Sequence, residues 1–271
     1  MKLKKTNIKN WVLMAPLVLL LSCVSLGSHP TLEQRAEVRK YSSDKVIPDY
    51  ILRVKDKDSK KIRKMKDILE NVPDAIQKKI NDFGGKVLIF EGKMTDNPEL
   101  SHLKGTFLGY RRVEDLEATY WRKPRIAAVK LVLSGSYGGG NPVLHEYGHL
   151  GDHAFGDISE SSEFRKVYEA NPCTSSYSDG LPLCNSSSVF LSRSEYAYLH
   201  EYFATLFADY SFSDRLRAKL KKEYPEAHEF FTNFTMYYAS KESRKELKKE
   251  SPEVYEFYTD LEKTLRVFNN R

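Results

Sequence analysis

The residues with the clearest chemical capacity form the run His145-Glu146-Tyr147-Gly148-His149. On a helix, His145 and His149 lie one turn apart on the same face, so both imidazoles can bind one metal ion. Zinc suits such a donor set, and it lowers the pKa of a bound water to about 7. Glu146 lies beside the histidines, where it can take a proton from that water as general base. The run therefore predicts a hydrolase with one Zn2+ per chain.

A catalytic zinc takes a third protein ligand, which the same helix does not supply. Phe155 occupies the position at which one class of zinc peptidase carries its third histidine, and phenylalanine cannot ligate. We expect Glu201 as the third ligand, because its helical neighbours include Ala204, Thr205 and Ala208, whose small side chains let a second helix approach closely. The competing ligands are Glu195, Glu160, Glu163 and His200.

Two further roles surround this predicted metal. Asp152 lies seven residues after His145 on the same helix face, where it either accepts a ring N–H from a ligating histidine or is solvated. A tetrahedral oxyanion also needs a hydrogen-bond donor, and the phenol of Tyr196 or Tyr198 would supply one.

The elements that must position these residues follow from local patterns. Asn141-Pro142 marks the start of the helix that carries the histidines. Residues 58–82 have helical periodicity that Pro73 divides. Residues 86–90 and 126–133 are predicted strands, and most of the remaining chain is helical. The expected fold class is α+β, mostly helical with a short mixed sheet and an active-site helix.

The first 22 residues have the features of a bacterial export signal. Four lysines precede an apolar stretch from Trp11 to Leu21, which is shorter than the roughly 20 residues of a membrane span. The stretch ends in Leu20-Leu21-Ser22-Cys23, which resembles a lipobox, so Cys23 is the expected lipidation site. We therefore expect a lipoprotein anchored to a membrane outside the cytoplasm; the alternative is a secreted protein cleaved near Gly27-Ser28.

Charge and cysteine content agree with this interpretation. The formal net charge is +6, and removing the four lysines of the signal leaves about +2, so no nucleic-acid partner is expected. Cys173 and Cys184 flank a polar loop, and in an oxidising compartment they are predicted to form a disulfide. The predicted organisation is a signal over 1–22, a tether over 23–57 and one monomeric catalytic domain over 58–271.

Residues of about 60–271 resemble the catalytic domain of anthrax lethal factor and its relatives, which include the Pro-Pro endopeptidases. The matching segments are Met94-Thr-Asp-Asn-Pro-Glu-Leu100, the glycine-rich stretch before the histidine run, Asp152, and Glu201-Tyr-Phe-Ala with Phe207.

The resemblance implies a small zincin fold with zinc held by His145, His149 and Glu201. It also implies a tyrosine seven residues before the glutamate; Ser194 stands there, and Tyr196 fits a connection that is two residues shorter. It further implies that a peptide substrate binds along an edge strand near Tyr137, Gly138, Gly139 and Gly140.

These observations predict an exported zinc endopeptidase that acts on a peptide or protein substrate. Two alternatives remain open at this stage. One is a catalytically inactive lipoprotein that keeps the fold as a binding module, and the intact Glu146 argues against it. The other is a zinc amidase that acts on cell-wall peptide, and the family resemblance argues against that one.

Overall fold

The computed structural model describes residues 46–57, 59–108, 111–131, 141–170 and 195–269, without the side chains of 195–198 and 266–269. The signal sequence, Cys23, the Cys173–Cys184 pair and the stretch from Tyr137 to Gly140 lie outside these residues and stay predictions. Among the described helices, none has both the length and the apolar character needed to cross a bilayer.

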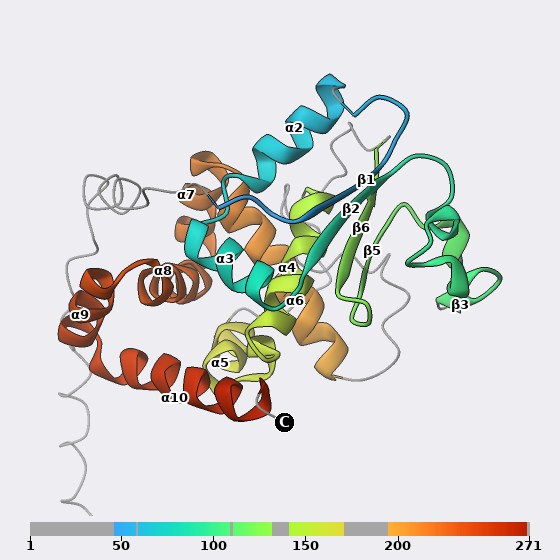
Figure 1. Cartoon of the computed structure of the whole chain (residues 1–271). Helices are drawn as coiled ribbons and strands as arrows, with labels where there is room; N and C mark the ends of the chain where they lie inside the picture. Colours follow the sequence, from blue (N-terminus) through green and yellow to red (C-terminus); the bar gives the residue numbers. More distant parts are fainter. Residues whose placement is uncertain (1–45, 58, 109–110, 132–140, 171–194, 270–271) are drawn as a thin grey trace, which may run out of the picture. The chain divides into compact units, whose positions relative to one another are not determined.

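A four-stranded mixed sheet lies against the helix that contains His145 and His149 (Figure 1). Its strands, in spatial order, are β1 (Tyr50–Arg53), β2 (Lys86–Phe90), β6 (Ile126–Lys130) and β5 (Ala118–Trp121). The first three run parallel, and β5 is antiparallel to β6. The mixed sheet and the many helices confirm the predicted fold class.

The two faces of the sheet bury alternate residues of the same strands, as the two-residue period of a strand requires. Val87 and Val129 point into the main core, which also contains residues of the helices. Leu88 and Ala128 point into a smaller cluster on the opposite face. Short 3-10 turns cover that second face: η1 (Met94–Asp96), η2 (Ser101–Leu103) and η3 (Val113–Asp115), with the hairpin β3 (Phe107–Leu108) and β4 (Arg111–Arg112) between them.

The helices contribute most of the main core. Along the chain they are α2 (Lys60–Leu69), α3 (Asp74–Asp82), α4 (Pro142–Ala154), α5 (Ser162–Ala170), α6 (Glu195–Phe212), α7 (Asp214–Glu223), α8 (Pro225–Ala239), α9 (Lys241–Glu250) and α10 (Pro252–Asn269), with the 3-10 turn η4 (Ile158–Glu160) between α4 and α5. Pro73 separates α2 from α3, as predicted. The strand predicted over 86–90 has the same bounds as β2, whereas the one predicted over 126–133 ends at Lys130 among the described residues.

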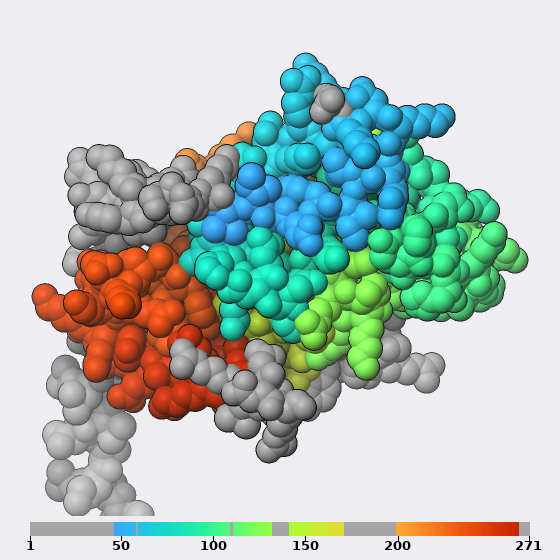
Figure 2. Space-filling model, viewed as in Figure 1, coloured from blue at the N-terminus to red at the C-terminus, as the bar shows by residue number. Residues whose placement is uncertain are grey.

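The tether predicted over 23–57 is wrong at its C-terminal end. Tyr50 to Arg53 form β1, whose register with β2 pairs Tyr50 with Val87 and Arg53 with Phe90. In the space-filling view, this blue segment forms part of the surface, as expected for a strand at the end of the sheet (Figure 2). The folded part of the chain therefore begins before residue 58.

The C-terminal helices repeat one arrangement at an interval of 27 residues. Ser213 caps α7, and Ser240 caps α9, each through its side-chain oxygen. Arg217 Nε donates to the Tyr210 carbonyl at 3.0 Å, and Arg244 Nε donates to the Tyr237 carbonyl at 2.6 Å. Helices α8 and α10 begin with similar sequences, Pro-Glu-Ala-His-Glu-Phe-Phe and Pro-Glu-Val-Tyr-Glu-Phe-Tyr, at the same interval. The repeat therefore includes these helix starts, the capping serine and the arginine.

Helices α4 and α6 pack unusually closely. A Cβ atom added at Gly148 would lie 2.9 Å from Ala204 Cα and 3.1 Å from Ala204 O. Both neighbours are backbone atoms, so they cannot move aside without shifting α6. Gly148 and Ala204 thereby set the distance between the helix of His145 and His149 and the helix of Glu201.

Helix α6 also buries a carboxylate that lacks full hydrogen bonding. Asp209 is 2% exposed, and its Oδ2 atom has no hydrogen-bond partner. Burial raises the pKa of Asp209 from 3.8 to about 6, although Lys219 and His145 favour the charged form. The folded protein therefore binds a proton here more tightly than the unfolded chain does.

We predict that Gly148→Ala destabilises the protein by about 1–3 kcal/mol, because the added methyl group overpacks the α4–α6 contact. Gly151→Ala is the matched control in the same helix, since its Cβ would meet only Ile80 Cδ1 at 3.5 Å. That control should gain up to about 1 kcal/mol from helix propensity. Urea denaturation of both variants measures the difference, and equal changes would argue against the close contact.

We also predict that Asp209→Asn stabilises the metal-free protein by about 1–3 kcal/mol at neutral pH. Between pH 4 and 6 the folded state retains a proton that the unfolded chain has lost, so the stability of the unaltered chain falls as pH rises through this window. Asparagine does not titrate. Urea denaturation of both proteins across pH should show that the variant is more stable at neutral pH and that the difference disappears below about pH 4. The control is Asp67→Asn, because Asp67 is an exposed residue.

Candidate metal centre

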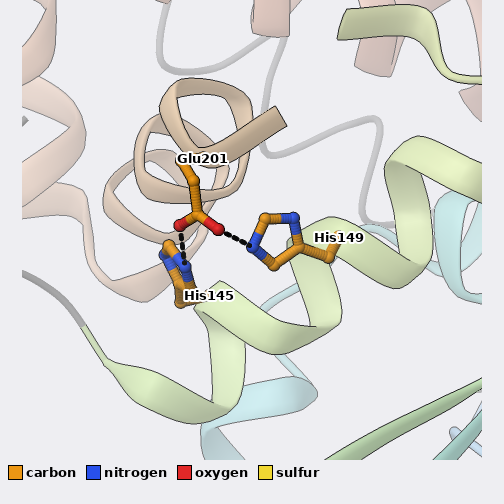
Figure 3. Close-up of side chains that lie close together, drawn as sticks. All are labelled: His145, His149 and Glu201. Atoms are coloured by element: carbon orange, nitrogen blue, oxygen red, sulfur yellow. Dashed lines mark hydrogen bonds and ion pairs between the residues drawn. The ribbon is translucent and has the colours of Figure 1, made fainter. Parts of the chain in front are cut away.

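The side chains of His145, His149 and Glu201, from two helices, converge on one another (Figure 3). His145 and His149 project from α4, and Glu201 projects from α6 between them. His145 Nε2 lies 3.2 Å from Glu201 Oε2, and His149 Nε2 lies 3.4 Å from Glu201 Oε1. The structure therefore brings together the three residues that the sequence predicts as ligands.

The local sequence explains why α4 presents its histidines in this way. Asn141 caps the helix, because its side-chain oxygen accepts from Val143 N at 3.0 Å and from Leu144 N at 3.3 Å. Pro142 then occupies the first helical position, where its missing N–H costs nothing. The cap fixes the start of the helix less than one turn before His145.

These distances fit a zinc ion. Four ligands placed tetrahedrally at zinc bond lengths of about 2.0–2.2 Å lie about 3.3–3.6 Å from one another. The two observed nitrogen–oxygen distances are close to this range, and the ligand atoms of the group all lie within 4.8 Å of one another. Two imidazoles and one carboxylate are a donor set that zinc prefers, with one coordination position left open.

Neighbouring groups orient the ligands and set their charge. Thr205 Oγ1 lies 3.4 Å from His145 Nδ1; a hydrogen on Nδ1 that donates to this hydroxyl leaves the Nε2 lone pair facing Glu201. Burial disfavours a charged His149, but Glu201 and Glu146 outweigh it and raise the pKa of His149 to about 9. Burial likewise opposes ionisation of Glu201, yet the two histidines hold its pKa well below the usual value. In the metal-free protein, the two carboxylates therefore favour a protonated His149. A cation that binds the three side chains would displace this proton.

Glu146 lies at the junction of α4 with the sheet. It is 9% exposed, and burial raises the pKa of its carboxyl group, although His145 and His149 oppose that shift. Its carboxylate accepts a hydrogen bond from the backbone N–H of Tyr120 in β5. The Tyr120 ring stacks on His149 with the ring centroids 6.3 Å apart, and its hydroxyl lies 2.5 Å from His153 Nδ1. One residue of β5 thus contacts the predicted base, a ligand and a third histidine.

Asp152 has different partners from the ones considered from sequence. It is 1% exposed, so it is not solvated, and its carboxylate forms hydrogen bonds with Ser159 and His200. Although burial disfavours a charged imidazole, the hydrogen bond from His200 to Asp152 raises the pKa of His200. Asp152 therefore links α4 to α6 through a histidine that does not belong to the metal group.

The remaining candidates differ in how far the structure describes them. His200 and Glu160, two competing ligands, bond to each other at 3.1 Å between His200 Nε2 and Glu160 Oε1. Tyr196 and Tyr198 belong to the first turns of α6, but their side chains lie outside the described part of the chain. Sequence reasoning did not find the roles of Thr205 and Tyr120. The four-residue spacing of Thr205 after Glu201 is the one local signal that points to the first of them.

Comparison with known proteins gives consistent relatives. A protein named Pro-Pro endopeptidase from Paenibacillus alvei is 29% identical over 174 residues, which cover 61% of this chain and 73% of that protein. A second Pro-Pro endopeptidase, from Clostridioides difficile, is 27% identical over 156 residues, which cover 55% of this chain and 64% of that protein.

Among solved structures, that of the Pro-Pro endopeptidase PPEP-2 from Paenibacillus alvei superposes with a TM-score of 0.54 at 24% identity, over 68% of this chain and 96% of that one. This likeness concerns the fold. Residues 36–234, which include every described residue of the metal centre, match the family described as "Anthrax toxin lethal factor, N- and C-terminal domain". The match spans more than half of the chain, which therefore belongs to the anthrax toxin lethal factor family.

Proposed function

We propose that the chain is a zinc-dependent endopeptidase that hydrolyses peptide bonds, with Glu146 as general base. The observation that carries this proposal is the convergence of His145, His149 and Glu201 beside a buried glutamate. The family membership and the names of the two relatives support the same activity. When bound, zinc would act as a Lewis acid that polarises the scissile carbonyl and activates a water.

The chain's own residues then supply the proton transfers. Glu146 takes a proton from the attacking water and returns it to the leaving amine, so that the carboxylate is regenerated. Burial raises the pKa of the Glu146 carboxyl group above its usual value, which strengthens it as a proton acceptor. The hydrogen bond from the Tyr120 N–H keeps the carboxylate in place during both transfers.

Strand β5 offers an edge along which an extended peptide can bind. Lys130 N donates to Glu117 O at 2.7 Å, so alternation along the antiparallel pair turns the backbone groups of Ala118 and Tyr120 away from β6. Within the described residues, β5 pairs only with β6. The Tyr120 N–H already donates to Glu146, so a substrate strand there would pair through the backbone of Ala118 and would lie next to Glu146. This edge is an alternative to the one predicted at Tyr137 to Gly140.

The oxyanion donor is part of the same proposal. Tyr196 lies in α6 five residues before Glu201, and Tyr198 lies three residues before it. A phenol from either residue would stabilise the negative charge that develops on the carbonyl oxygen. Conversion to phenylalanine removes this hydroxyl, so the two single variants identify which tyrosine donates.

We further propose that the chain is a bacterial lipoprotein anchored through Cys23 outside the cytoplasm. The support comes from the sequence: four lysines, an apolar stretch and Leu-Leu-Ser-Cys23 in the expected order. Attached acyl chains contribute about 0.8 kcal/mol per buried methylene, so several chains anchor a protein without a spanning helix.

Glu146→Gln should lower peptide cleavage by at least about 100-fold, because the amide cannot take the water's proton, while zinc content stays near one ion per chain. The assay uses a proteome-derived peptide library together with a set of Pro-Pro peptides, chosen because of the relatives' names. Mass spectrometry of the native protein measures the zinc. Unchanged cleavage would remove Glu146 from the mechanism, and a zinc-free active protein would exclude the metal mechanism.

Cys23→Ala should abolish membrane anchoring when the full chain is produced in a bacterium. The readouts are incorporation of a labelled fatty acid and partition into a detergent phase. Cys173→Ala is the matched control, because it also removes one thiol but leaves the lipobox intact, and it should retain the label. Lipid label on the Cys23→Ala variant would contradict the anchor.

A further inference from the structure

A second polar cluster, separate from the metal centre, lies where α4, η4 and α6 meet. Ser159 N donates to Asp152 Oδ1 at 2.8 Å, and Ser159 Oγ donates to Asp152 Oδ2 at 2.7 Å. His200 Nδ1 lies 2.5 Å from Asp152 Oδ2 and 2.9 Å from Ser159 Oγ. Because an ionised carboxylate only accepts, the hydrogen of this short contact belongs to His200 Nδ1. Three donors from two elements therefore converge on one buried carboxylate.

This cluster is already satisfied without a metal ion. Asp152, Asp157 and His200 have ligand atoms within 4.8 Å of one another, a geometry that would admit a cation. Yet Asp157 pairs with Arg122, and His200 Nε2 faces Glu160 Oε1 at 3.1 Å. A cation would have to displace these partners and the donors on Asp152. The cluster is better explained as a link between helices.

The link between the helices affects the metal centre, because His200 is the residue next to the ligand Glu201. His200 directly precedes Glu201, so their side chains leave α6 about 100° apart around its axis. The Gly148–Ala204 contact sets the distance between the helices, and Phe207 of α6 packs beside it. The hydrogen bond between Asp152 and His200 adds a directional contact between the same helices, and its length depends on the rotation of α6. A rotation of α6 by about 20° would move a side-chain tip by about 2 Å. Metal ligands tolerate only about 0.2 Å.

We propose that the hydrogen bond between Asp152 and His200 fixes the rotation of α6 and thereby positions Glu201 for zinc. His200 and Asp152 are positioning residues that act through Glu201, and the inference rests on the proposed zinc site. The same hydrogen bond ties the last turn of α4 to the turn of α6 that carries the ligand. Both ends of the bond therefore lie within four residues of a ligand in sequence.

The test measures zinc affinity of the full chain by competition with a chromophoric chelator. His200→Ala and His200→Gln should weaken zinc binding by about 10–100-fold. His200→Asn should retain most of the affinity, because its amide nitrogen lies near the position of Nδ1 and can donate to Asp152. In His200→Gln the amide nitrogen lies near the position of Nε2 and reaches Glu160 instead. Glu160→Ala is the control, and its affinity should change by less than about threefold.

A second readout separates positioning from general stability. Replacement of zinc by Co2+ gives a visible spectrum that reports the ligand geometry, and this spectrum should change in His200→Gln but not in His200→Asn. Urea denaturation of the metal-free variants checks that each one folds. If the His200→Gln, His200→Asn and unaltered chains bind zinc with equal affinity, the positioning role of the Asp152–His200 hydrogen bond is overturned. The proposed function would remain intact. Failure of the unaltered chain to bind zinc would overturn both.

Discussion

The close approach of α4 and α6 is the constraint on which the metal centre depends. One straight helix supplies two adjacent donors on one face, and the next residue on that face is too far along for the same ion. The third donor must therefore come from another helix whose backbone is very near. Gly148 provides that proximity, because it places no side chain between its own helix and Ala204. Glycine costs about 1 kcal/mol in the middle of a helix, and here that cost supports the geometry of the ligands.

The sheet contributes as much to the site as the two helices do. Tyr120 in β5 donates its backbone N–H to Glu146 and stacks its ring on His149. This arrangement requires β5 to be at the edge of the sheet, because an inner strand would use the same N–H to pair with a neighbouring strand. The base and one ligand are thus held by an element that lies more than twenty residues before them in sequence. The packing of α4 against α6 determines the positions of the ligands, and the position of β5 in the sheet determines that of Glu146.

The sequence predicts those features whose signals are local. The histidine run, the division at Pro73 and the strand over 86–90 each follow from spacing or periodicity. The sequence also predicts Glu201 as the third ligand, because small residues surround it on one face of its helix. The strands β1 and β5 were missed, because four residues carry too little alternation to stand out from a polar context. The partners of Asp152 were missed for another reason: His200 lies 48 residues away, and only tertiary packing brings it close.

Three buried carboxylates near the α4–α6 interface differ in how many donors they receive. Asp152 accepts from three donors, and these hydrogen bonds hold α4, η4 and α6 together. Glu146 accepts from one backbone N–H and has a raised pKa, which suits a group that exchanges protons. Asp209 has an oxygen without a partner, and burial there lowers stability at neutral pH. The number of donors around each carboxylate, rather than its burial alone, therefore decides which one anchors the fold and which one is suited to catalysis.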